Sequence, residues 1–217
     1  MIRKINYPNV FIFGKSSVIS KKLKKKFPKA KLFSRKDEFK DPSSFVKILN
    51  KKEINIIIYV SAILRNKNFV NQTKEEIIES FEVNSWNFIQ IVEKINDRKL
   101  PAKLIYLSSE SAEKGSFDTS YWLSKSSTES FIKECVMKNK KSSIIGIAPS
   151  TIEDTNMTLN RNDNSRLKRY KTKHPKKRFL KSNEIVSLIE FLIKFDSEYL
   201  TNEIIKINGG KFARRKD

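Results

Sequence analysis

The fold of this chain is decided by two neighbouring stretches, Lys103-Leu104-Ile105-Tyr106-Leu107-Ser108-Ser109 and Ser120-Tyr121-Trp122-Leu123-Ser124-Lys125-Ser126. The first predicts a buried strand over 103–108, and the second opens a helix expected over 120–138. Tyr121 and Lys125 are four residues apart, which places their side chains on one face of that helix. A cation beside a phenol lowers the phenol's pKa from its usual value near 10, so the pair predicts proton exchange with a carbonyl or an alcohol. The alternative is an ordinary surface tyrosine and surface lysine.

Strand-like and helix-like patterns alternate on both sides of these stretches. Further strands are expected over 10–13, 31–34, 54–61, 143–148 and 204–207, and further helices over 18–27, 41–50, 74–96 and 182–194. Residues 156–181 are polar, basic and aperiodic, which predicts a loop or a mobile helical excursion, and Ser182 is expected to cap the last helix. The alternation predicts an α/β fold, a Rossmann-like doubly wound parallel sheet in one three-layer α/β/α domain over 1–210, with a basic tail at 211–217.

The composition limits the classes of function. One domain is the default for 217 residues, and a formal charge of +21 would suit nucleic acid or an anionic membrane. The 45 Lys+Arg are spread along the chain, which favours a compositional bias, so nucleic-acid binding is not expected as the main function. No apolar run is long enough to span a bilayer, and the start is too short and polar for a secretion signal, so we expect a cytoplasmic protein without membrane partners.

The single cysteine excludes an internal disulfide and a cysteine-based metal site, and no metal is expected. Cys135 is expected to be buried in the helix over 120–138. His174 lies in a lysine-rich segment and is interpreted as a bystander.

The turn after the first strand is placed where a phosphate-binding turn would be. Gly14-Lys15-Ser16-Ser17-Val18-Ile19-Ser20 joins a strand to a helix, whose N-terminal N–H groups can face a phosphate. Val18 and Ser20 stand where such turns usually have glycine, and a β-branched residue suits neither a positive φ nor a close pyrophosphate. Ser16 and Ser17 could still bind phosphate through their hydroxyls and amides.

The end of the second strand bears on the choice of nucleotide. In a dinucleotide-binding fold an acidic residue here takes the ribose 2′-hydroxyl, whereas an arginine accommodates a 2′-phosphate. Ser34-Arg35-Lys36 is basic, and Asp37 comes slightly too late, so NADP(H) is favoured over NAD(H).

Small and hydroxylated residues follow two further strands. Ser61 and Ala62 would let a ligand lie against the backbone after the strand over 54–61. Ser108 and Ser109 place hydroxyls at the carboxyl end of the strand over 103–108, where a hydroxyl can hydrogen-bond a substrate oxygen as charge develops on it.

Together these pieces resemble the short-chain dehydrogenase/reductase family from about residue 10 to residue 210. The resemblance rests on Gly14-x-Ser16-Ser17-x-Ile19, Ser61-Ala62, Val83-Asn84, Ser108-Ser109, Tyr121-x-x-x-Lys125, Ala148-Pro149-Ser150 and Ile207-Asn208-Gly209-Gly210. The five glycines of the chain lie where the family commonly has glycine. The chain departs from the family at Val18, Ser20, Ile63 and Ser150.

The resemblance implies roles for the polar residues. Tyr121 would be the general acid/base, and Lys125 would hold the nicotinamide ribose and lower the pKa of Tyr121. Ser109, with Ser108 as the fallback, would polarise the substrate carbonyl. Asn84 would shape its helix so that a bound water completes a proton relay to Lys125. The implied cofactor contacts are Gly14, Ser16, Ser17, Ile19, Ser34, Arg35, Ala62, Tyr121, Lys125, Pro149 and Ile152.

The function implied is that of an NAD(P)H-dependent oxidoreductase that interconverts a carbonyl and an alcohol, as a homodimer or homotetramer. The basic surface would suit an anionic small-molecule substrate, such as a nucleotide sugar or an acyl carrier thioester. One alternative is a nucleotide-sugar epimerase or dehydratase, against which the short C-terminal portion argues. The other is a non-catalytic NADP-binding or nucleic-acid-binding relative, against which Ser109, Tyr121 and Lys125 argue.

Overall fold

The computed structural model describes residues 9–34, 42–65, 67–161 and 164–213. Its strands form one parallel sheet in the order β2-β1-β3-β4-β5-β6. The strands are β1 (Val10–Phe13), β2 (Lys31–Phe33), β3 (Asn55–Tyr59), β4 (Ala102–Leu107), β5 (Ser143–Pro149) and β6 (Glu203–Ile207). The strand order reverses between β1 and β3, and ligands bind parallel sheets of this kind at the carboxyl ends beside such a point.

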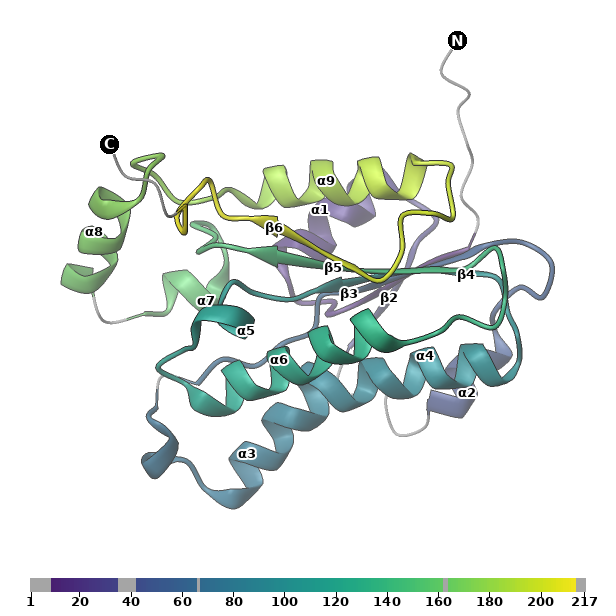
Figure 1. The fold of residues 1–217 in the computed structure, drawn as a ribbon, viewed down its shortest axis with the longest axis horizontal. Helices are drawn as coiled ribbons and strands as arrows, with labels where there is room; N and C mark the ends of the chain where they lie inside the picture. Colours follow the sequence, from purple (N-terminus) through teal and green to yellow (C-terminus); the bar gives the residue numbers. More distant parts are fainter. Residues whose placement is uncertain (1–8, 35–41, 66, 162–163, 214–217) are drawn as a thin grey trace, which may run out of the picture.

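Helices cover both faces of the sheet (Figure 1). On one face lie α1 (Val18–Lys26) and α9 (Ser182–Lys194), and on the other lie α2 (Pro42–Lys47), α4 (Asn87–Asp97) and α6 (Thr119–Glu134). Alternate strand residues supply the two cores, because successive side chains of a strand point to opposite faces. Ile12 and Ile58 pack with α1 and α9, whereas Phe13 and Tyr59 pack in the core with α4. The predicted three-layer α/β fold is confirmed.

The helix expected over 74–96 is interrupted in its middle. It consists of α3 (Lys74–Phe81), a π-helical turn η2 (Glu82–Trp86) and α4. Tyr59 and Tyr106 lie opposite each other on β3 and β4, with their rings stacked 5.9 Å apart. The Tyr59 hydroxyl donates to the carbonyl of Val83 at 2.7 Å, and the Tyr106 hydroxyl donates to the carbonyl of Asn84. The two tyrosines therefore donate hydrogen bonds to two consecutive carbonyls of the π turn. Single π turns within α-helices are often found at functional sites.

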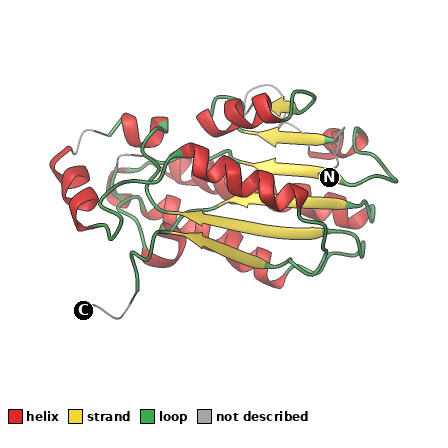
Figure 2. Cartoon of the chain, turned by 90° about the horizontal axis from the view of Figure 1, so that it is seen from above, coloured by secondary structure: helices red, strands yellow, loops and turns green. Residues whose placement is uncertain are grey.

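Two helices lie in the segment that was expected to be either a loop or a helical excursion, so the loop alternative was wrong. They are α7 (Asn156–Leu159) and α8 (Asn164–Lys173), and the remaining short elements are η1 (Phe69–Asn71) and α5 (Ser111–Lys114). In α8 the Arg166 guanidinium donates to the Tyr170 hydroxyl one turn later, at 2.7 Å. Figure 2 shows the strands side by side, with the α7–α8 segment beyond their arrowheads. This segment therefore covers the edge of the sheet at which a ligand is expected.

Three local expectations need correction. Helix α6 ends at Glu134 instead of residue 138, because the Asn96 side chain binds the backbone of the following residues, at 2.9 Å to the Val136 carbonyl and 2.8 Å to the Lys138 N–H. Cys135 is buried, but it is the residue that caps this end. The N-cap of α9 is residue 181 instead of Ser182.

His174 is a buried side chain that follows α8, and its Nδ1 accepts from the backbone N–H of Lys176 at 3.1 Å. No helix in the described ranges is long and apolar enough to cross a membrane.

Candidate active site

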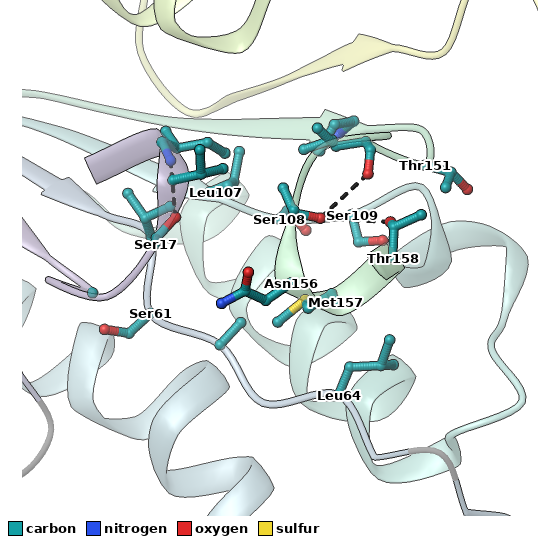
Figure 3. Close-up of a pocket in the computed structure, with 18 of the residues that line it drawn as sticks. Ser17, Ser61, Leu64, Leu107, Ser108, Ser109, Thr151, Asn156, Met157 and Thr158 are labelled. Carbon is teal, nitrogen blue, oxygen red and sulfur yellow. Dashed lines mark hydrogen bonds between the residues drawn. The ribbon is translucent and has the colours of Figure 1, made fainter. Parts of the chain in front are cut away.

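A cavity of about 650 Å³ lies at the carboxyl ends of β1, β3, β4 and β5. Figure 3 shows Ser17, Ser61, Ser109 and Met157, from four different segments, around it. The predicted site residues that line it are Gly14, Ser16, Ser17, Ile19, Ser34, Ala62, Ser109, Tyr121, Lys125, Pro149 and Ile152. Asn84 does not line the cavity, and Arg35, with the neighbouring Lys36 and Asp37, lies outside the described residues.

The turn after β1 is held closely against the end of β3. Gly14 has a φ of +105°, and its N–H donates to the Phe33 carbonyl at 3.0 Å. A Cβ at Gly14 would lie 2.9 Å from the backbone nitrogen of Ser61, so only glycine fits. Ser17 caps α1 by accepting from the Ile19 N–H at 3.2 Å. Val18 is the first residue of the helix, and its φ is not positive. The backbone conflict expected for a β-branched residue at this position therefore does not occur.

The residues of this turn fit a phosphate-bearing nucleotide. Helix α1 has no acidic residue in its first turn and three lysines in its last turn, so the positive end of its dipole is available to an anion. The Ser61 hydroxyl is buried at the cavity wall and has no hydrogen-bond partner among the described residues. Buried polar atoms nearly always have a partner, so a ligand that bonds this hydroxyl fits the site. The Ser20 hydroxyl also lacks a described partner, but Ser20 does not line the cavity.

A buried aspartate fixes the start of helix α6. Asp118 is the N-cap residue and accepts from the Tyr121 N–H at 3.0 Å. It also accepts from the Arg65 backbone N–H at 2.6 Å and from the side chains of Gln72 and Ser120. Because these bonds come from separate segments, the first turn of α6, which carries Tyr121, is rigidly placed.

Tyr121 lies beside Ser109, whereas Ser108, which also lines the cavity, has its hydroxyl bonded to Glu129. Burial raises the pKa of Tyr121 to about 12, and the hydrogen bond with Ser109 acts in the opposite direction but is the weaker effect. The Ser108 hydroxyl donates to Glu129, a buried carboxyl whose pKa burial raises. The pKa of Tyr121 is thus raised where the sequence predicted a lowering by Lys125, because burial is the largest effect on this phenol.

Lys125 is fully buried, and its amine is bonded to the backbone at the end of β4. Its Nζ donates to the Leu107 carbonyl at 2.8 Å and lies 4.4 Å from the centre of the Tyr106 ring. The same nitrogen is 5.9 Å from the centre of the Tyr121 ring. Burial lowers the pKa of Lys125 to about 7, while the Glu129 carboxylate raises it. The lysine can therefore be charged or neutral near neutral pH.

Asn84 ties the loop after β3 to helix α6. Its amide nitrogen donates to the Ile63 carbonyl at 2.9 Å and to the Ser124 hydroxyl at 3.1 Å, and its amide oxygen accepts from the Ile63 N–H at 2.7 Å. Its own backbone carbonyl accepts from Tyr106 and from Thr128. Asn84 thus positions the groups around Lys125, and its part in a water relay stays a prediction.

Sequence reasoning missed three polar groups near the site. Glu129 follows Lys125 by four residues on the same helix face, so its spacing could have revealed it. Tyr106 stands inside an apolar strand and gave no separate signal. Glu110 lines the cavity with a buried Oε2 that has no hydrogen-bond partner among the described residues.

Replacing the buried lysine is expected to stabilise the fold in a pH-dependent way. The unfolded chain keeps the Lys125 proton to its ordinary pKa of 10.5, while the folded protein releases it near 7. Between pH 7 and pH 10.5 the unfolded state binds more protons than the folded state, so the destabilisation caused by Lys125 becomes smaller as the pH rises. Below pH 7 the lysine is charged in both states, and the full cost of burying that charge is present. Lys125→Met should therefore raise the free energy of unfolding more at pH 6 than at pH 9, by on the order of 2 kcal/mol.

Urea unfolding at the two pH values measures this difference. Lys133→Met, an exposed position on the same helix, is the control and should change stability equally at both. A gain for Lys125→Met that does not depend on pH would contradict the buried, proton-releasing lysine.

Comparisons with known proteins bear on this arrangement. A family model described as "Enoyl-(Acyl carrier protein) reductase" matches residues 43–211. The chain is similar to 3-oxoacyl-(acyl-carrier-protein) reductase FabG from Buchnera aphidicola subsp. Baizongia pistaciae (strain Bp), with 30% identity over 166 residues. That match covers 73% of this chain and 66% of the relative, slightly less than two thirds of its length.

Two solved structures resemble the fold over nearly its whole length. A short chain dehydrogenase family protein from Francisella tularensis subsp. tularensis SCHU S4 has a TM-score of 0.78 and 18% identity, and the match covers 96% of this chain and 100% of that one. A tyrosine-to-phenylalanine variant of ElxO with NADPH bound has a TM-score of 0.76 and 14% identity, covering 95% and 99%. At such identities the likeness shows the fold alone.

Proposed function

Because this chain belongs to the short-chain dehydrogenase/reductase family of oxidoreductases, we propose that it interconverts a carbonyl and an alcohol with an NAD(P) cofactor. One observation carries the proposal. Ser109, Tyr121 and Lys125 line the same cavity as the Gly14 turn, whose features fit a phosphate-bearing nucleotide. A hydride source and a proton source would then meet at one edge of the sheet.

The proposed roles follow from the environment of each side chain. A bound nicotinamide would supply or accept the hydride. Ser109 and Tyr121 would hold the carbonyl oxygen, and Tyr121 would give it a proton. A pKa of about 12 keeps the Tyr121 phenol protonated at neutral pH, as the proton donor in carbonyl reduction must be. Lys125 would bind the nicotinamide ribose, and Asn84 would keep it in place through Ser124 and the π turn.

The cofactor is proposed to be NADP(H) in preference to NAD(H). Arg35 follows β2 in the sequence at the position where an arginine accommodates a 2′-phosphate, and Ser34 lines the cavity. The ElxO variant, whose fold this chain shares, has NADPH bound, which supports the same choice. By family analogy we also propose a cytoplasmic homodimer or homotetramer.

Titration with NADPH and NADH, followed by cofactor fluorescence, tests the cofactor proposal. NADPH should bind more tightly, and Arg35→Ala should weaken NADPH binding by about tenfold with little effect on NADH, because one charge-assisted bond to phosphate is lost. Lys29→Ala, which removes an exposed charge before β2, is the control and should change neither affinity. Absence of binding at millimolar concentrations of both cofactors would favour the non-catalytic alternative.

A further inference from the structure

Glu129 is a buried carboxyl on the face of α6 that also carries Tyr121 and Lys125. It follows Lys125 by four residues, so the two side chains are neighbours one helical turn apart. Burying a carboxyl is costly unless it is bonded or paired, and the proposed reaction gives Glu129 no part. Its position next to the lysine indicates where its effect is felt.

Adjacent residues at the end of β4 hold the carboxyl and the amine. The Ser108 hydroxyl donates to Glu129 Oε1, and Ser108 also lines the proposed cofactor cavity. The Lys125 Nζ donates to the carbonyl of Leu107, the residue just before Ser108, at 2.8 Å. Because neighbouring residues of one strand end hold both groups, the carboxyl and the amine keep a fixed relation to each other.

The aromatic rings near the Lys125 amine carry no charge at neutral pH. They belong to Tyr106 and Tyr121, whose ring centres lie 4.4 Å and 5.9 Å from Nζ. Burial raises the pKa of both phenols, so neither can balance the charge of the amine. Among the described residues, Glu129 is the group whose negative charge opposes the effect of burial on Lys125.

Several other charged residues face Glu129 from the elements around it. They are Glu110 before α5, Glu113 in α5, Lys133 in α6 and Lys206 in β6. The two acidic neighbours have ion pairs of their own, Glu110 with Lys211 and Glu113 with Lys206. Glu129 makes no ion pair with any described residue. Its negative charge is therefore available to the buried amine, with Lys133 as the competing cation.

We propose that Glu129 is a positioning residue that keeps the buried amine of Lys125 charged at neutral pH, so that the amine can hold the nicotinamide ribose. The inference rests on the proposed function, because that function gives Lys125 its ligand. Without the carboxylate, burial would act on the amine unopposed, and Lys125 would release its proton at a lower pH. Glu129 thus extends the pH range in which the site can bind its cofactor.

A titration of Lys125 in the protein without cofactor tests the inference directly. NMR of isotope-labelled lysine side chains reports the charge of each amine, and the signal missing from Lys125→Met identifies Lys125. In the unmodified protein this signal should titrate near pH 7, and in Glu129→Gln the midpoint should lie about one pH unit lower. Glu134→Gln removes the same charge from an exposed position on α6 and should leave the midpoint unchanged.

The reverse measurement keeps the inference testable if Glu129→Gln does not fold. Coupling between two sites is reciprocal, so Lys125→Met should raise the midpoint of the Glu129 carboxyl by a similar amount. An unchanged Lys125 midpoint in Glu129→Gln, an equal shift in Glu134→Gln, or an unchanged Glu129 midpoint in Lys125→Met would each overturn the inference.

Binding of NADPH then shows whether this charge serves the proposed function. If only the charged amine holds the ribose, Glu129→Gln should weaken NADPH binding about tenfold at pH 8 but only about twofold at pH 6. Glu134→Gln should bind like the unmodified protein at both. A shifted Lys125 midpoint with unchanged NADPH affinity would uphold the coupling to Glu129 and contradict the proposed role of Lys125.

Discussion

Tyr121→Phe should lower the rate of carbonyl reduction by about a thousandfold and leave the affinity for NADPH unchanged within about twofold. Proton donation by a positioned side chain contributes roughly 10² to 10⁴ to a rate, and this substitution removes the donor without creating space in the core. The Tyr121 side chain is 7% exposed, so phenylalanine keeps its packing and loses only the hydroxyl and the bond with Ser109.

The consumption of NADPH at saturating substrate measures the rate, and cofactor fluorescence measures the affinity. Tyr199→Phe is the matched control, because it removes the same hydroxyl from a residue that is 98% exposed. Its rate should equal that of the unmodified protein. A Tyr121→Phe enzyme that retained more than a tenth of the rate would show that another group supplies the proton.

The arrangement of strands and helices could be predicted from the chain because it depends on local patterns. The apolar strands alternate with helical repeats, and burial of β1, β3 and β5 on both faces follows directly from their composition. The ends of helices were harder to predict because distant residues decide them. The end of α6 depends on a hydrogen bond from the Asn96 side chain to the Val136 carbonyl, 40 residues away in the sequence. No residue near Glu134 indicates this contact.

The electrostatics of the site could not be predicted from spacing. The four-residue interval correctly places Tyr121 and Lys125 on one buried helix face, but it carries no information about burial depth. Burial raises the pKa of Tyr121 and lowers that of Lys125, so each group is pushed toward its neutral form. The π turn that supports them depends on hydroxyls from Tyr59 and Tyr106, whose bonds span 24 and 22 residues of sequence.

Gly14→Ala is expected to destabilise the protein by about 3 kcal/mol and to abolish detectable NADPH binding. Roughly 1–2 kcal/mol comes from placing an L-residue in a left-handed conformation, and the rest from a Cβ that would lie 2.9 Å from the Ser61 backbone nitrogen. Gly210→Ala separates these causes, because Gly210 has a φ of +79° and no atom within 4 Å of an added Cβ. It should cost only the conformational part and keep NADPH binding.

Urea unfolding gives both free energies, provided that the dependence on urea concentration is the same for the two variants. Equal losses of stability, or equal retention of cofactor, would show that the approach of the Gly14 turn to Ser61 has no special role. A loss confined to Gly14→Ala would mean that one glycine maintains the cofactor turn. Val18 and Ser20 would then be tolerated in place of the usual glycines, because α1 begins at Val18 without a positive φ. The Ser17 cap and the Gly14 contact would be enough for the helix to present its N-terminus to a phosphate.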